Sequence, residues 1–137
     1  MDFYNHTRKL FAAGEVDEAN LKVMLVGAGY TFAATETALT AVTSAQVSGN
    51  GWTAGGEAVA NSAVTAVGAN AKLDGDDISV TASGGDIGPA TALVVVDATS
   101  SKPLLHFEFP SSQSAGDGTP FKVTWNTAGI ATFTSPA

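Results

Sequence analysis

The sequence predicts a mainly β protein, a single antiparallel β-sandwich of jelly-roll-like or Ig-like type with a short helical arm at its N-terminus. Three observations lead to this prediction. Short β-type runs recur at intervals of roughly ten residues between glycine-rich turns, as they do in sandwiches. Several runs alternate apolar and polar residues, which is the period of a strand with one buried face. Helical patterns do not alternate with these runs, which disfavours an α/β architecture.

The arm is the first element expected. Asp2 is placed to cap a short helix, and Gly14 is placed to end it. The apolar side chains of this stretch are Phe3, Tyr4, Leu10 and Phe11. A helix this short is marginal by itself, because nucleation costs more than so few turns return. These side chains must therefore pack on something, either their own domain or a neighbouring subunit.

The body of the protein is expected to follow a hinge. Residues 15–20 are acidic and polar, so we expect an arm and hinge over residues 1–20 and a β-sandwich body over residues 21–137. Two apolar runs in the body, Leu21 to Val26 and Leu93 to Val96, are rich enough for strands buried on both faces. We expect these two strands at the centre of the sheet.

The region between the two central strands is less regular. Residues 35–42 are expected to form one or two helical turns, and residues 49–56 a wide loop that carries Trp52. The stretch from Val59 to Val67 contains enough alanine for a helix, but its flanking glycines favour a strand.

Three later segments alternate apolar and polar residues, so each predicts a strand with one buried face. The side chains expected on the buried faces are Ile78 and Val80, then Leu105, Phe107 and Phe109, then Phe121, Val123 and Trp125. By the same alternation, His106 is expected on a polar, solvated face. A turn at residues 126–129 precedes a last strand near residues 130–134.

Composition limits the classes of function. A chain of 137 residues fits one domain with one core. Charged residues make up 14% of the chain, against roughly 25% in ordinary soluble domains, which suits a subunit covered by neighbours and also a secreted domain. The net charge of −7 repels phosphate backbones, so nucleic acid is a poor partner. The absence of cysteine excludes disulfides and thiolate nucleophiles.

Two further features bear on location. No charged segment followed by an apolar one begins the chain, so we expect no secretory signal. The longest uncharged stretch, residues 37–56, is too polar to cross a membrane, and we therefore expect a soluble protein without a membrane partner.

Patterns that suggest cofactor or metal chemistry are weak. The apolar run that ends in Gly27, Ala28 and Gly29 is similar to the start of a dinucleotide-binding turn, but Phe32 occupies the position that must be small. Asp74, Asp76 and Asp77 surround Gly75, where an acidic turn and a structural cation site remain alternatives. We expect no bound cofactor and leave open whether the three aspartates hold a cation.

Catalytic constellations are equally weak. His6 and His106 are too few for a three-histidine metal site, and no serine lies in a nucleophile elbow. A glycosidase needs two neighbouring carboxylates, so Glu57, Asp97 and Glu108 are candidates only if the fold brings two of them together. We expect no enzymatic activity. Trp52 has two alternatives, folding back on its own body and filling a neighbour's pocket.

Three glycine-punctuated phrases carry a resemblance to a known family. They comprise Gly49, Gly51, Trp52, Gly55 and Gly56, then Ser83, Gly84, Gly85, Ile87, Gly88 and Pro89, then Gly116, Asp117, Gly118 and Phe121. The strand-like run from Leu21 to Val26 precedes them, and Gly129, Ile130, Thr132 and Phe133 close the chain. In this order, over residues 20 to 134, the sequence resembles small structural virion proteins of tailed bacteriophages.

The resemblance implies a capsid decoration or cement protein. Such a protein binds the major capsid protein on the outer surface of the head, is assembled in the host cytoplasm, and often associates with itself as a homotrimer. The assembly contacts would come from the arm and from the glycine loop. The residues expected to make them are Phe3, Tyr4, Leu10, Phe11 and Trp52.

Two alternatives remain open. A phage tail or head-to-tail component would use the same type of body, although a tail-tube protein is expected to offer a long hairpin and no long paired strands are evident in the sequence. A carbohydrate-binding adhesion module would show exposed aromatic residues on a shallow face, for which Trp52 with Tyr30 is the candidate pair.

Overall fold

The structure is a computed structural model that describes residues 1–134. The described chain forms short helices and antiparallel strands. The helices are α1 (Thr7–Ala12) and α2 (Thr40–Ser44). The strands are β1 (Asp2–Phe3), β2 (Leu21–Val26), β3 (Gln46–Val47), β4 (Glu57–Ala58), β5 (Ala63–Val67), β6 (Asn70–Asp74), β7 (Ile78–Thr81), β8 (Ile87–Asp97), β9 (Lys102–Ala115), β10 (Pro120–Val123) and β11 (Ala131–Phe133). The predicted mainly β, antiparallel fold is confirmed.

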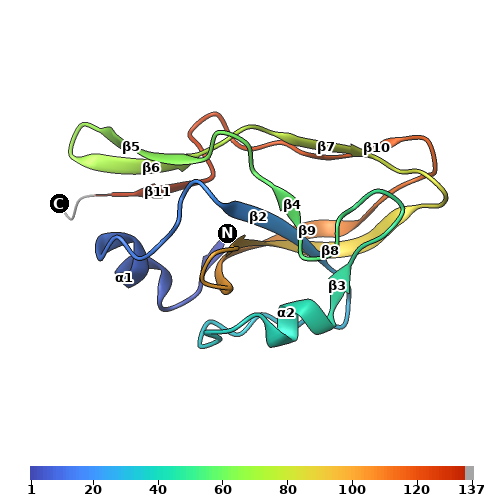
Figure 1. The fold of residues 1–137 in the computed structure, drawn as a ribbon, viewed down its shortest axis with the longest axis horizontal. Helices are drawn as coiled ribbons and strands as arrows, with labels where there is room; N and C mark the ends of the chain where they lie inside the picture. The colour runs from blue at the N-terminus through green and yellow to red at the C-terminus, as the bar shows by residue number, and fades with distance from the viewer. Residues whose placement is uncertain (135–137) are drawn as a thin grey trace.

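A six-stranded sheet forms the centre of the molecule (Figure 1). Its strand order is β1-β9-β8-β2-β3, and β4 pairs with the first half of β2. Two small sheets, β7 with β10 and β5-β6-β11, lie side by side in a layer above one face (Figure 1). The segment that contains α2 lies below the other face (Figure 1). The central sheet is thus covered on both sides.

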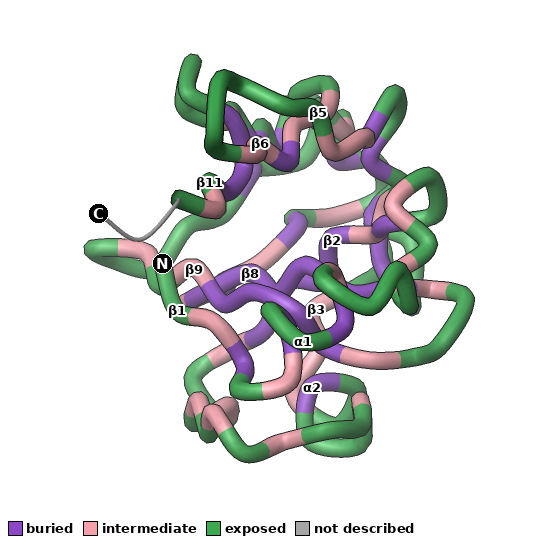
Figure 2. The backbone as a smooth tube through the Cα atoms, turned by 90° about the vertical axis from the view of Figure 1, so that its left-hand side faces the viewer, coloured by how far each residue is buried: buried purple, intermediate pink, exposed green. Residues whose placement is uncertain are grey.

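The two faces of the central sheet support two separate hydrophobic clusters. Along β2, Val23 and Leu25 point into the larger cluster, and Met24 and Val26 into the smaller one. The strands β2 and β8 are buried over almost their whole length, so the prediction of central strands buried on both faces is confirmed. Figure 2 shows the buried segments concentrated in this sheet.

Several predicted elements are shifted in the structure. The N-terminal helix begins at Thr7 with His6 as its N-cap, and Asp2 lies in β1 instead of capping it. Gly14 ends the helical segment with φ +71°, as predicted. The later helical turn spans α2 rather than residues 35–42, and the predicted strand at 59–67 starts only at Ala63, where β5 begins.

The prediction that no long paired strands occur is wrong. β8 has 11 residues and β9 has 14, and together they form a long hairpin. This hairpin does not project freely, because its turn is bound to the 17–20 segment: Ala98 N–H donates to the Asn20 carbonyl, and Asp17 N–H donates to the Asp97 carboxylate. None of the helices in residues 1–134 is long and apolar enough to span a membrane.

Candidate functional site

Tyr4, the first of the predicted assembly residues, lies fully buried in the smaller cluster. Its ring packs edge-on against Phe32 at 5.0 Å, and its hydroxyl is hydrogen-bonded to the Tyr30 hydroxyl. Tyr30 in turn donates to the Glu36 carboxylate over 3.2 Å. Burial is the main cause that raises the pKa of both tyrosines above its ordinary value. Tyr4 therefore belongs to the interior of its own chain.

The remaining arm residues also contact their own body. Leu10 is buried in the larger cluster. Phe3 and Phe11 are partly buried, and both pack against Phe133 of β11, at 5.9 Å and 5.0 Å between ring centroids. The Arg8 guanidinium lies 4.3 Å from the centre of the Phe3 ring, at cation–π distance. Of the two alternatives for the arm, the structure shows packing on its own domain.

Trp52 is buried as well, at 2% exposure, and packs edge-on against Phe121 at 5.5 Å. It folds back on its own body, so it is not available to fill a neighbour's pocket. Its indole N–H has no hydrogen-bond partner among the described residues. Tyr30 packs against the cluster on the opposite face of the central sheet, so the predicted aromatic pair for carbohydrate binding is wrong.

His106 corrects another prediction. The alternation along β9 places it on a polar face, but the structure buries it at 4% exposure. The ring of Phe32 stacks on its imidazole at 4.7 Å, and its Nδ1 lies 3.1 Å from the Asp2 carboxylate. The cause is the 27–45 segment, which covers this face of the sheet. The Gly27 to Gly29 stretch within it is a turn without a following helix, as expected.

The three aspartates near Gly75 use their carboxylates in separate contacts. Asp74 accepts a hydrogen bond from Gly75 N–H and lies 3.5 Å from the Lys72 ammonium. Asp76 accepts from the Asn61 amide, and Asp77 accepts from Trp125 N–H. In the described part of the chain, no group of three or more potential metal ligands occurs. These carboxylates stabilise turns.

The three glycine-rich phrases meet at one end of the β8–β9 hairpin. Ser83 N–H donates to the Asn50 carbonyl, and the Asn50 amide donates to the Asp86 carbonyl. Asp86 and Asp117 accept hydrogen bonds from backbone N–H groups, at Asp117 and Gly84 respectively. We call this unit, residues 49–52, 82–86 and 116–119, the three-loop end. Its carboxylates are occupied within the unit, which fixes the loops to one another.

Glycine is required at the three-loop end for steric reasons. Gly51 has φ +112°, and a Cβ there would lie 2.8 Å from the Thr81 carbonyl oxygen. At Gly85, with φ +150°, a Cβ would lie 2.8 Å from the Asn50 side chain. Both positions have a positive φ, which favours glycine, and at Gly51 the close contact is with backbone that cannot move aside. The glycine phrases are therefore structural determinants of this end.

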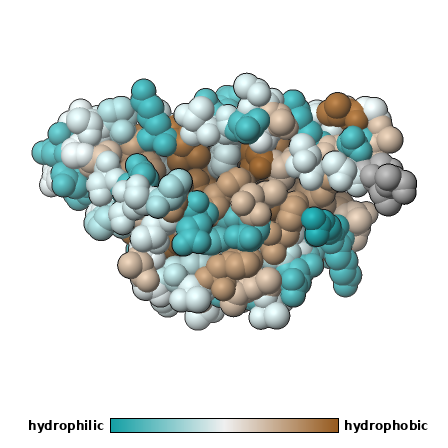
Figure 3. All heavy atoms as spheres, turned by 180° about the vertical axis from the view of Figure 1, so that it is seen from behind, coloured by the Kyte–Doolittle hydropathy of each residue, from teal (hydrophilic) through white to brown (hydrophobic). Residues whose placement is uncertain are grey.

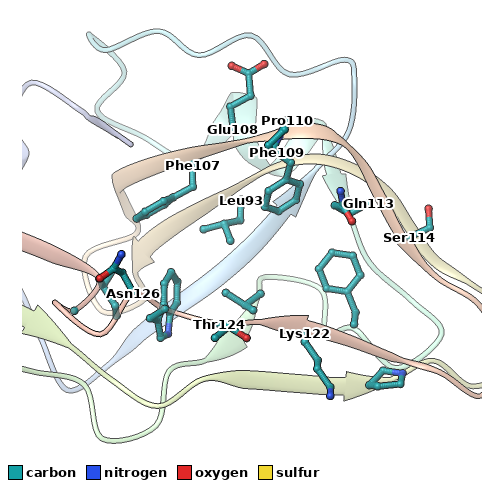
Figure 4. A pocket seen from close by; sticks show the side chains of 16 residues that line it. Leu93, Phe107, Glu108, Phe109, Pro110, Gln113, Ser114, Lys122, Thr124 and Asn126 are labelled. Atoms are coloured by element: carbon teal, nitrogen blue, oxygen red, sulfur yellow. The ribbon is translucent and has the colours of Figure 1, made fainter.

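A groove that the sequence did not reveal lies between the central sheet and β10. It has a volume of about 610 Å³. Phe107, Phe109 and Leu93 enter it from the β8–β9 side, and Thr124 and Lys122 lie on the facing segment (Figure 4). Trp125 also lines it and packs against Phe107 at 5.8 Å. Trp125, which was predicted to lie in the core, is only half-buried and packs against the edge of the larger cluster.

An irregularity of β9 forms one wall of this groove. Ala90 pairs with Gln113 and Ala92 with Glu108. Between these two pairs β8 advances by two residues and β9 by five, so β9 bulges here. Pro110 lies within this bulge and has no N–H for the ladder. Apolar side chains gather between polar ones across the middle of the molecular face seen in Figure 3. Polar residues, including Gln113 and Asn126, also line the groove.

Comparison with known proteins gives no relative. No protein-family model, no curated protein and no solved structure matches this chain.

Proposed function

We propose that the chain is a structural virion protein that binds the outer surface of a phage head and stabilises its lattice, as capsid decoration or cement proteins do. The convergence of the glycine phrases carries this proposal, because parts of all three phrases that resemble virion proteins meet in one hydrogen-bonded unit, the three-loop end. Loops fixed in advance lose little conformational entropy on binding. Weak contacts of such loops are multiplied by the symmetry of a shell.

The location of the protein on particles tests this proposal and its runner-up together. An antibody raised against the purified chain is applied to intact particles of the encoding phage and detected by immunogold electron microscopy. Label on the head supports a decoration protein. Label on the tail or neck replaces it with the tail or head-to-tail alternative. Particles without label, with the protein also missing from their mass spectrum, overturn both.

The three-loop end is the part proposed to contact the shell. Ser83 is exposed within it, whereas Ser100 is exposed in the turn at the opposite end of the β8–β9 hairpin. Ser83→Arg should weaken co-sedimentation with heads that lack the protein at least tenfold, because a bulky charge is added to the contact. Ser100→Arg is the matched control and should bind like the wild type. Equal binding of all three proteins would contradict docking through this end.

A carbohydrate-binding adhesion module is the second candidate, and the groove favours it. Partly exposed aromatic rings, Phe107 and Trp125, line the groove together with the polar residues Gln113 and Asn126, whereas the Glu108 side chain points away from it (Figure 4). Aromatic faces beside polar groups suit a sugar ring. A glycan array probed with labelled protein tests this candidate: a retained glycan that Trp125→Ala releases supports it, and an array without signal removes it.

A further inference from the structure

The outer edge of β5 is an unprotected strand edge, and it is longer than that of β11 at the other side of the same small sheet. β5 is the last strand of its small sheet and pairs only with β6 among the described residues. Its sequence is Ala63, Val64, Thr65, Ala66 and Val67, with three consecutive residues exposed at its end. Val67 is 53% exposed, one of two large apolar side chains so exposed in residues 1–134. Free strand edges invite pairing with another chain unless they are protected.

The other edges of comparable length are protected in ways that β5 is not. β10 begins at Pro120 and carries Lys122. The free part of β9 carries Glu108 and Pro110 and is bulged. The end of β7 is covered by the loop at Gly51, which approaches the Thr81 carbonyl too closely for a Cβ. Charges, prolines, bulges and covering loops are the usual means of blocking edge pairing. β5 has neither charge nor proline.

The sequence of β5 is suited to pairing with itself. Thr65 lies at its centre, and the two residues at equal distance before and after Thr65 are always one alanine and one valine. In an antiparallel pair across a twofold axis, Thr65 would face Thr65 of the second copy, and each valine would face an alanine. Threonine pairs and complementary sizes are favourable cross-strand neighbours. The absence of charge on this edge also matters, because each copy carries a net charge of −7.

We propose that two copies of this chain associate through antiparallel pairing of their β5 strands across a twofold axis. The small sheet β11-β6-β5 would then continue into that of the second copy, and Val67 would be covered. The β5–β6 hairpin projects at the end of its layer, where a second molecule has room to approach (Figure 1). This contact goes beyond the proposed function and does not depend on it. A twofold contact closes without leaving a free edge.

The mass of the particle in solution is the first test. A twofold contact gives a dimer, or a hexamer if a threefold contact also forms. The interface is short, so sedimentation equilibrium is measured up to about 1 mM, the range in which weak contacts appear. An even number of chains supports the proposal. A monomer at every concentration, or a trimer, overturns it.

Charge substitution at the centre of the strand is the second test. Thr65 lies opposite Lys72 of β6 in the same molecule, so an aspartate at this position gains a favourable partner within the fold. In the proposed dimer, the same Thr65→Asp places two carboxylates against each other. Thr65→Asp should therefore stay folded by circular dichroism and become monomeric. Thr43→Asp, at an exposed threonine of α2, is the matched control and should stay dimeric. A dimer of Thr65→Asp as stable as the wild type overturns the proposal.

Mixing and cross-linking separate the proposal from a general loss of stability. Thr65→Lys faces Lys72 within its own fold, so circular dichroism must first show that it is folded. The folded Thr65→Lys should also be monomeric, and an equal mixture with Thr65→Asp should recover dimers, since each lysine then faces an aspartate. The chain has no cysteine, so a single Thr65→Cys provides a clean probe. Directly opposite residues lie within reach of a disulfide. Mild oxidation should convert most of Thr65→Cys into a covalent dimer, and little of Thr43→Cys. Equal cross-linking of the two variants overturns the proposal.

Discussion

At the residue scale, Gly51 shows why the glycine phrases are required. Gly51→Ala forces an alanine into φ +112° and brings its Cβ against the Thr81 carbonyl. We expect a loss of about 2–4 kcal/mol in the free energy of unfolding, from backbone strain and close packing together. Gly29→Ala is the control, because a Cβ there meets nothing within 4 Å and its φ is not positive. Urea denaturation measures both, and equal stability of the two variants would contradict the steric explanation.

The paired tyrosine hydroxyls predict how stability depends on pH. Burial raises the pKa of Tyr4 and Tyr30 in the folded state, so the folded chain keeps these protons while the unfolded chain releases them near pH 10. Their contribution to stability is fully present below about pH 10 and is lost as the pH rises further. Above this pH, the proton that Tyr4 keeps only in the folded chain lowers the free energy of unfolding by about 1.4 kcal/mol for each pH unit.

Denaturation curves between pH 8 and about 11.5 measure this loss. Tyr4→Phe should fall less steeply with pH than the wild type, because one of the two coupled protons is absent. Absorbance of tyrosinate at alkaline pH is a second readout, unambiguous because the chain has two tyrosines. It should rise together with the loss of β structure. Ionisation of both tyrosines in a protein that is still folded would disprove the explanation.

At the scale of elements, the N-terminal segment is part of the body. β1 pairs with β9 through Asp2 and Phe3, the Thr7 hydroxyl donates to the Leu104 carbonyl, and His6 contacts the Pro103 carbonyl. Deleting residues 1–14 therefore removes a strand and takes Tyr4 out of the smaller cluster. Removing one core aromatic side chain typically lowers the free energy of unfolding by about 3–5 kcal/mol, and we expect the deletion to lower it by more.

Thermal unfolding followed by circular dichroism measures the effect of this deletion. The comparison is Arg8→Ala, which removes the cation–π contact to Phe3 and should cost about 1 kcal/mol or less. A deleted protein that melts cooperatively at the wild-type temperature would show that the segment is a detachable arm.

The elements that the sequence predicted well are those decided by local rules. Period-two alternation identified β7 and β10, and unbroken apolar runs identified β2 and the middle of β8, since a strand buried on both faces has no polar positions. Glycine phrases identified the loops because positive φ is a local demand. The environment of His106 required knowledge that a distant segment covers the second face of the sheet, and alternation carries no such information.

The candidate site was harder to predict than the fold. The resemblance implied five assembly residues, for which packing within the chain was the alternative. The structure places Tyr4, Leu10 and Trp52 in the two hydrophobic clusters, and Phe3 and Phe11 against Phe133. The groove was missed because it depends on how β9 and β10 are placed in space. Pro110 inside an otherwise regular strand pattern was a signal of the bulge that shapes it. The convergence of three loops, likewise, depends on the length of the β8–β9 hairpin.

At the scale of the whole molecule, the small share of charged residues, 14%, suits a subunit that is covered by the shell it binds. If the proposed function is correct, heads assembled without this protein should release DNA at a lower temperature than decorated heads. Fluorescence of a DNA-binding dye during heating measures the release. Adding the purified wild-type protein should restore the higher release temperature, and Ser83→Arg should restore it only in part. Identical release temperatures with and without the protein would contradict a cementing role.

The pairing of β1 with β9 has a consequence for synthesis on the ribosome. Asp2 and Phe3 meet Leu105 and His106, about one hundred positions later in the chain, and Phe11 meets Phe133. Asp2 and Phe3 therefore leave the exit tunnel about one hundred residues before Leu105 and His106, and they wait unpaired during that interval. The aromatic rings of this segment stay exposed to other nascent chains meanwhile, so the rate of elongation sets how long the newborn protein is vulnerable to aggregation.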